Sequence, residues 1–184
     1  MLSLSKKITL LTFLFTCFIL DGCLVGNKIV YEVNLTSHNK GTATVIYTNI
    51  RSNALGGAKL EEDKNILFSY MLKSDKFVDD MKKEGKEIIS RDLFLEDGKL
   101  NGKATYRFSK LSDVENLSFE DRFYFVTLSL EDSVISTNGL ILKSSNYKRI
   151  MWDSTFNTLK FEILTEPADS ENLTDLAQFH NSDE

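Results

Sequence analysis

Cysteine is almost absent from this chain, and both cysteines lie near the N-terminus. Cys17 stands inside an apolar run, and Cys23 follows that run. The residues beyond Cys23 therefore have no disulfide, no thiolate nucleophile and no cysteine-ligated metal. We expect them to fold as one cooperative domain that is stabilised by an ordinary hydrophobic core, without a metal.

Proline and clustered positive charge are also scarce. Pro167 is the only proline, so Pro-rich linkers are excluded and one continuous domain is expected. The chain has 22 basic and 27 acidic residues, a net charge of −5, and no basic block. Because nucleic-acid binding relies on clustered Lys and Arg, we expect no nucleic-acid partner. Aromatic residues make up 11% of the chain, which argues against disorder.

Motifs that carry chemistry are missing as well. His38 and His180 stand in a predicted turn and near the C-terminus, where we expect solvated side chains, and no histidine pair has zinc-binding spacing. Gly56-Gly57 lacks the lysine of a phosphate loop, and Glu96-Asp97-Gly98 is too short for a calcium loop. A glycosidase carboxylate pair would be assembled only by the fold, and nothing selects one. We therefore predict no catalytic residue, no metal and no cofactor, and we do not expect an enzyme.

The apolar run from Ile8 to Leu20 has 13 residues, fewer than the ~20 that a membrane-spanning helix needs. It follows the positive Lys6-Lys7 and precedes Leu20-Asp21-Gly22-Cys23, a pattern typical of a signal peptide. The last four residues resemble the bacterial lipobox, in which a peptidase cuts before a lipid-modified cysteine. Asp21 departs from the small or uncharged residue usual at that place. The alternatives are an uncleaved anchor helix and ordinary secretion.

The lipobox interpretation divides the chain into four parts. We predict a lipoprotein signal peptide over 1–22, a lipidated tether over 23–27, an α+β domain over 28–166 and an acidic tail over 167–184. In the tail, Ser170 is predicted to cap a short helix. Without residues 1–22 the net charge is −6, so acyl chains such as palmitate on Cys23, and not a basic patch, would hold the protein to the membrane. We expect it in the bacterial cell envelope, facing away from the cytoplasm.

Hydrophobic periodicity predicts the fold class. Residues 29–35 alternate between apolar and polar, residues 42–50 are β-branched and apolar, and the turn 37–41 lies between them, which predicts a β-hairpin. Leu60, Leu67 and Met71 fall at helical spacing. Ser74 is predicted to cap a second short helix, which Gly85 ends.

The second half of the chain has the pattern of strands. They are predicted over 88–95, 100–109, 122–130, 134–135, 140–143, 149–152 and 159–164, with a hairpin turn at Asp97-Gly98. Strands in series pair antiparallel. We therefore predict an α+β fold with a curved, largely antiparallel β-sheet and one helical segment packed on a face. Such a sheet is large enough to curl and to leave a concavity beneath the helices.

Several short segments resemble the LppM-like group of bacterial envelope lipoproteins. The resemblance rests on the lipobox, the hairpin Lys28–Ile50 with Lys40-Gly41, the helix that opens at Ser74-Asp75, the turn Thr137-Asn138-Gly139 and the strand Ile150-Met151-Trp152. It covers most of residues 23–165. Members commonly carry a C-terminal transmembrane helix, for which this sequence has no apolar run. The resemblance implies that a lipid or glycolipid binds in an apolar cavity, and no ligand residues carry over.

Large apolar side chains from the helices and strands are the candidates for lining such a cavity. The candidate pocket residues are Phe68, Met71, Phe77, Tyr106, Phe108 and Trp152. The alternative is that they only fill the core, since large apolar residues at element period are usually buried. Trp152 and Ile150 are predicted to face inward together.

The sequence is compatible with three functions. The first is the binding of a lipid or another apolar ligand, which a cavity of ~300 Å³ or more would favour. The second is a structural or interaction lipoprotein that binds another envelope protein, which an exposed apolar patch or a bare edge strand would favour. The third is an enzyme, which a cluster of carboxylates or a histidine of perturbed acidity would favour.

Overall fold

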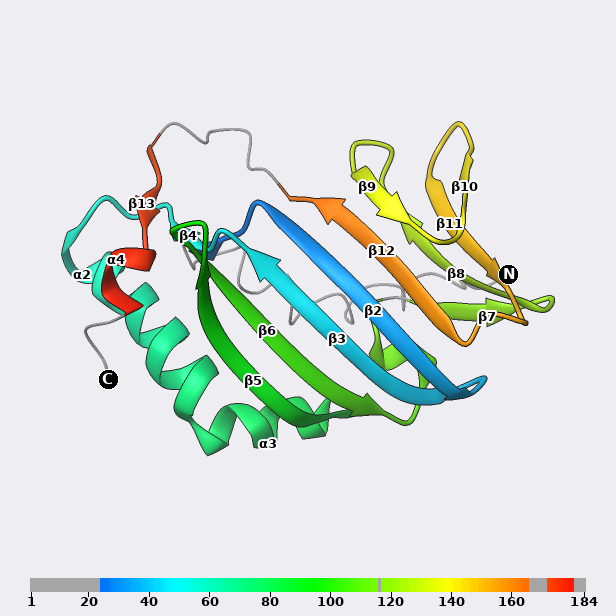
Figure 1. Ribbon diagram of the computed structural model, residues 1–184, viewed down its shortest axis with the longest axis horizontal. Coiled ribbons are helices and arrows are strands. Elements are labelled where there is room, and N and C mark those ends of the chain that lie inside the picture. Colours follow the sequence, from blue (N-terminus) through cyan, green and yellow to red (C-terminus); the bar gives the residue numbers. More distant parts are fainter. Residues whose placement is uncertain (1–23, 116, 166–171, 181–184) are drawn as a thin grey trace, which may run out of the picture.

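The computed structural model describes residues 24–115, 117–165 and 172–180, and it is built around a six-stranded antiparallel sheet (Figure 1). The sheet order is β5-β6-β3-β2-β12-β9. Its strands are β2 (Lys28–Ser37), β3 (Lys40–Thr48), β5 (Lys86–Glu96), β6 (Lys99–Phe108), β9 (Ser133–Thr137) and β12 (Thr158–Leu164). The predicted α+β class with a curved, antiparallel sheet is confirmed. The predicted turn at Asp97-Gly98 joins β5 to β6, and both residues have the positive φ that such a turn requires.

A second antiparallel sheet, which the sequence did not predict, contains four strands in the order β10-β11-β8-β7. These are β7 (Ser118–Glu120), β8 (Phe123–Leu128), β10 (Leu140–Lys143) and β11 (Lys148–Asp153). The chain changes sheets at Asn138 and Gly139, between β9 and β10. A Cβ at Gly139 would lie 2.6 Å from Trp152 Nε1, so only glycine fits this crossing. In both sheets, successive side chains along a strand point to opposite faces. The alternation of apolar and polar residues therefore does not show which strands belong to which sheet.

The two sheets share a hydrophobic core. Buried residues of β2, β3, β6 and β12 pack on Tyr124, Val126, Ile150 and Trp152 of the second sheet. Trp152 is 1% exposed, and its ring centroid lies 5.8 Å from that of Phe161. Its Nε1–H donates to Asn138 Oδ1 at 2.7 Å. The prediction that Trp152 and Ile150 face inward is confirmed.

Three helical elements cover the rest of the same sheet face. They are α2 (Gly57–Lys64), the π-helix η1 (Asn65–Met71) and α3 (Asp75–Lys83). On β6, Tyr106 and Phe108 belong to the core between the sheets, whereas Leu100 packs in a second buried cluster with Leu67 and Phe68 of η1. Even-numbered residues of β6 share one face, so one face of the sheet meets the second sheet at one end and the helices at the other.

The predicted helix signals are found in place. Ser74 Oγ accepts from the backbone N–H of Lys76 at 3.1 Å and caps α3. Gly85, directly after the last turn, has φ of 82°. Within the residues that the structure covers, no helix is long and apolar enough to cross a membrane.

The two ends of the described chain form a small third sheet in the order β1-β4-β13. Its strands are β1 (Leu24–Val25), β4 (Arg51–Ser52) and β13 (Thr174–Asp175), and the helix α4 (Ala177–His180) follows. Residues 24–25, predicted to be tether, are therefore paired strand. Leu176, predicted to lie in the tail, is fully buried in the second cluster. Two-residue strands are too short for periodicity to reveal. The predicted signal peptide 1–22, Cys23, Pro167 and Ser170 lie outside the described residues.

Candidate functional site

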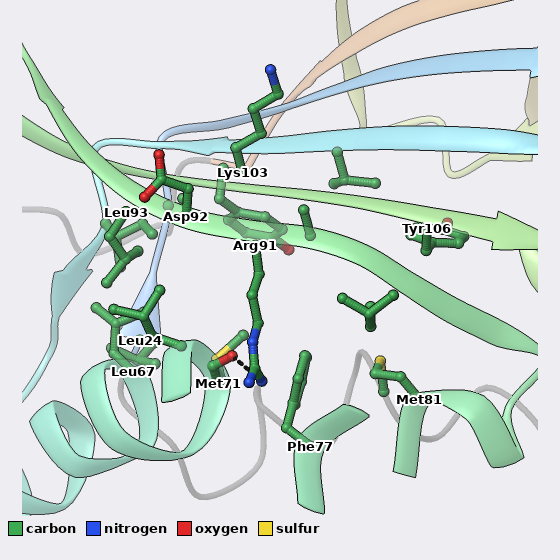
Figure 2. Close-up of a pocket in the computed structure, with 18 of the residues that line it drawn as sticks. Leu24, Leu67, Met71, Phe77, Met81, Arg91, Asp92, Leu93, Lys103 and Tyr106 are labelled. Atoms are coloured by element: carbon green, nitrogen blue, oxygen red, sulfur yellow. Dashed lines mark hydrogen bonds between the residues drawn. The ribbon is translucent and has the colours of Figure 1, made fainter. Parts of the chain in front are cut away.

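A cavity of about 190 Å³ lies between the inner face of the large sheet and the helices (Figure 2). This is the place where the sequence predicted a concavity. Its floor is formed by Val45, Tyr47, Ile88, Leu93, Gly102, Ala104 and Tyr106, from β3, β5 and β6. Its wall is formed by Leu67, Met71, Leu72, Phe77 and Met81, from η1, α3 and the link between them. Side chains of this kind make the interior almost wholly apolar.

Two small residues in the middle of β6, Gly102 and Ala104, border the cavity. Gly102 and Ala104 face the helices between the larger Leu100 and Tyr106 on the same strand face. A Cβ at Gly102 would lie 3.0 Å from Ile50 Cδ1 and 3.3 Å from Leu93 Cδ2. Glycine at position 102 is therefore required by the close packing of Ile50 and Leu93, and Ala104 is the short inward side chain of β6 that the cavity borders.

The helical wall of the cavity contains a π-helix, η1, whose turns are wider than those of an α-helix. In η1 the backbone N–H of Leu72 bonds to the carbonyl of Leu67, five residues back, in place of four. Leu67, Met71 and Leu72 all line the cavity. π-Helical turns are rare and occur often at functional sites. The helical periodicity of the sequence predicts a helix here but carries no signal for the wider turn.

Arg91 ties this wall to the sheet. Its Nη1 donates to the carbonyls of Met71 at 3.0 Å and of Ser74 at 2.9 Å, and its guanidinium carbon lies 5.7 Å from the centroid of the Phe77 ring. Figure 2 shows the side chain reaching from β5 to the helices, so that its apolar stem lines the cavity. The carbonyls at the end of η1 are thereby satisfied. Sequence reasoning did not identify Arg91, because a lone arginine in a strand has no distinguishing pattern.

A polar group closes the Tyr106 side of the cavity. Burial raises the pKa of the Glu115 carboxyl, and the Lys86 ammonium and a hydrogen bond with the Tyr31 hydroxyl only partly oppose that rise. Burial and the nearby Glu115 carboxylate also raise the pKa of Tyr106, so its hydroxyl stays neutral. Glu115 has φ of 35°, an uncommon conformation that the packing around it maintains. No sequence pattern distinguishes this carboxylate from the others.

Glu115 should make stability depend on pH. Its pKa in the folded protein is raised above the usual 4.5, so its contribution to stability is complete below that usual pKa and is lost as the pH rises through the raised value. Glu115→Gln is neutral at every pH. We expect the melting temperature of Glu115→Gln to rise relative to the parent protein as the pH increases from about 4 to about 8.

Melting curves of both proteins across this pH range measure the effect. Glu120→Gln, which removes a negative charge from an exposed site on β7, is the matched control. A difference between Glu115→Gln and the parent that does not change with pH would contradict the assignment.

The predicted pocket residues divide into two groups. Met71, Phe77 and Tyr106 line the cavity. Phe68, which is 3% exposed, packs in the cluster under the helices, and Phe108 and Trp152 lie in the core between the sheets. Alternation predicts which residues face inward, but it does not predict which part of the inner face is already filled. The lining residues that the sequence did not single out are small or aliphatic, such as Ala104 and Leu67, and have no signal of their own.

His38 lies in the β2–β3 turn and is exposed, as the sequence predicted, but it also contacts the second sheet. Its Nδ1 lies 2.7 Å from the hydroxyl oxygen of Tyr124, and its ring stacks on Phe119 with centroids 4.8 Å apart. The β2–β3 turn is thereby fixed to the second sheet. In the part of the chain that the structure covers, no group of three or more His, Cys, Asp or Glu residues is placed to hold a metal.

Comparison with known proteins gives no relative. No protein-family model matches the chain, and neither a curated protein nor a solved structure does. The resemblance to the LppM-like group therefore stays a prediction, and inferences about function rest on the residues and the cavity.

Proposed function

We propose that this protein is a membrane-anchored lipoprotein of the bacterial cell envelope that binds an apolar chain, such as the acyl chain of a lipid or glycolipid, in the cavity between β6 and the helices. The single observation that carries the proposal is the apolar cavity itself, which β6 borders with Gly102 and Ala104. The cavity opens to solvent, so an apolar ligand can reach it without unfolding of the domain.

The size of the cavity limits the ligand. Its 190 Å³ is less than the ~300 Å³ at which drug-sized pockets begin, and more than the ~150 Å³ of an apolar cavity that binds benzene. One small ring system, or part of one apolar chain, fits this range, whereas both chains of a phospholipid do not. Of these we propose a single chain, free or as part of a larger molecule.

The charged groups around the cavity support an apolar ligand. Arg91 is engaged by two backbone carbonyls, and Lys86 lies 3.9 Å from a Glu84 carboxylate oxygen and 6.0 Å from the Tyr106 ring centroid. A ligand that enters therefore need not supply a counter-charge to them.

Binding of a fluorescent fatty acid to residues 24–184, produced without the lipid, tests the proposal. We expect saturable binding, and we expect Ala104→Phe to weaken it at least tenfold, because the added ring would occupy the cavity. Thr105→Phe puts the same ring on the opposite face of β6, where Thr105 meets Thr44, and should leave binding unchanged. Absence of saturable binding by the correctly folded parent would overturn the proposal.

Lipidation is tested separately in a bacterial host that is fed a labelled fatty acid. Cys23→Ala is expected to abolish incorporation of the label and to leave the precursor uncut, because the thiol that would carry the acyl groups is gone. Unchanged labelling of Cys23→Ala would contradict the assignment of Cys23 as the anchor.

A second candidate function, binding to another envelope protein, is favoured by strand β10. In the parts of the chain described, β10 pairs only with β11, and Leu140 and Leu142 are 64% and 44% exposed. Exposed apolar residues on an edge strand can pair with a partner strand. Changing both leucines to lysine should abolish stoichiometric co-purification of such a partner and leave fatty-acid binding intact.

A further inference from the structure

The start of the described chain is part of the cavity wall. Leu24, Val25 and Gly26 all line the cavity, and Leu24 directly follows Cys23 in the sequence. In Figure 2, Leu24 lies beside Leu67 and Leu93, at the opposite end of the cavity from Tyr106 and Met81. An acyl group on Cys23 would thus be attached within one residue, about 3.3–3.6 Å of chain, of the cavity wall.

This attachment point is fixed by backbone pairing. Leu24 and Val25 pair with Ser52 and Arg51 of β4, and β4 pairs in turn with β13. The backbone N–H of Asn27 donates to the carbonyl of Thr48 at 2.8 Å. The residue that follows Cys23 in the sequence is therefore held in a sheet beside the cavity.

Gly26 brings the backbone against the cavity floor. A Cβ at this position would lie 2.7 Å from Cδ1 of Tyr47, which also lines the cavity. The residues between the attachment point and the sheet are therefore packed closely. They hold the chain at the cavity rim.

We propose that one of the acyl chains carried by Cys23 occupies the cavity, entering beside Leu24 and running along β6 toward Tyr106. This inference rests on the proposed function, both for the lipid on Cys23 and for the apolar ligand. The floor from Gly102 to Tyr106 spans four residues, about 13 Å, which suits an extended chain. Because the chain is covalently attached beside the cavity, its effective concentration there is high, and a free lipid has to compete with it for the cavity.

The chemistry of the interior agrees with this occupant. The polar part of the modified cysteine stays at the Leu24 end, so only hydrocarbon has to enter. The interior is mostly hydrocarbon, and Arg91 is already held by the Met71 and Ser74 carbonyls. A chain in the cavity is withdrawn from the bilayer. Because stable attachment takes two or more lipid chains, the protein would then be held more weakly.

A photoactivatable fatty acid tests the inference in the full-length protein. Cells that express the protein are fed a diazirine fatty acid, and the lipidated protein is purified in detergent and irradiated. We expect an intramolecular cross-link that joins the N-terminal peptide, through its acyl chain, to the peptide that contains residues 65–83. The Ala104→Phe variant, lipidated in the same way, should lose this cross-link, and Thr105→Phe should keep it.

The outcomes separate this inference from the proposed function. A cross-link from Cys23 to detergent or to exposed residues only overturns the inference. An intact free lipid attached in the cavity also overturns it, and leaves the proposed function standing. A lack of label on Cys23 overturns the inference as well. Absence of fatty-acid binding by unlipidated residues 24–184 would instead overturn the binding function, independently of the cross-link.

Discussion

Replacing Trp152 with alanine is expected to lower the free energy of unfolding by about 3–5 kcal/mol. Trp152 is 1% exposed and is the largest of the fully buried side chains. Its ring packs near Phe161, and its Nε1–H is satisfied by Asn138 at the turn where the chain changes sheets. The substitution would leave a cavity between the two sheets and would remove one of the two hydrogen bonds that Asn138 Oδ1 accepts, the other coming from the backbone N–H of Lys160 at 2.8 Å. Urea unfolding of residues 24–184 measures the loss.

Two further measurements make the Trp152 prediction specific. Phe123→Ala removes a 41% exposed ring from β8 in the same sheet, and should cost less than about 1 kcal/mol. Fatty-acid binding by folded Trp152→Ala should change little, because Trp152 does not line the cavity. Because Trp152 is the only tryptophan, its fluorescence reports this site alone. Emission typical of a water-exposed indole, together with a neutral Trp152→Ala, would contradict the structure of this core.

The fold class was predictable because its signals are local. Alternation in β2, β3 and β6, the Ser74 cap and the Asp97-Gly98 turn each depend on a few neighbouring residues. The division into two sheets was not predictable, because it depends on the long-range fit between Gly139 and Trp152. The short strand β13 was missed for a related reason, since its pairing with β4 joins residues more than 120 positions apart.

The candidate site was predictable only in outline. Large side chains such as Met71 and Phe77 are visible in the sequence as inward-facing, and the structure places them at the cavity. The cavity itself is bordered by the small Ala104 of β6 and by the wide turn of η1. Neither feature leaves a pattern that distinguishes it from ordinary strand or helix. Sequence reasoning therefore identified the layer that contains the cavity, and selected residues such as Phe108 that lie in the filled part of that layer.

Replacing Asp63 with alanine is the second change from which we expect a large effect, a loss of about 3 kcal/mol of stability together with weaker fatty-acid binding. Asp63 is 1% exposed, and its carboxylate accepts from Ser52 Oγ at 2.5 Å. Hydrogen bonds to charged groups contribute about 1.5–3 kcal/mol, and a buried group left without its partner adds a further cost. Because Ser52 pairs with both Leu24 and Thr174, this bond connects α2 to both other strands of the small sheet.

Weaker binding follows from the place of β1 in the cavity wall. Loss of the Asp63–Ser52 bond should loosen β4, and with it Leu24 and Val25, which line the cavity. Hydrogen exchange of the backbone amides in the small sheet should accelerate more than exchange in β2 or β3. Glu61→Ala on the same helix is the matched control, since it breaks only an exposed pair with Lys64 that is worth less than about 1 kcal/mol. If Asp63→Ala loses stability and keeps full affinity for the fatty acid, then β1 is not needed to hold the ligand, and the entry route beside Leu24 has to be abandoned.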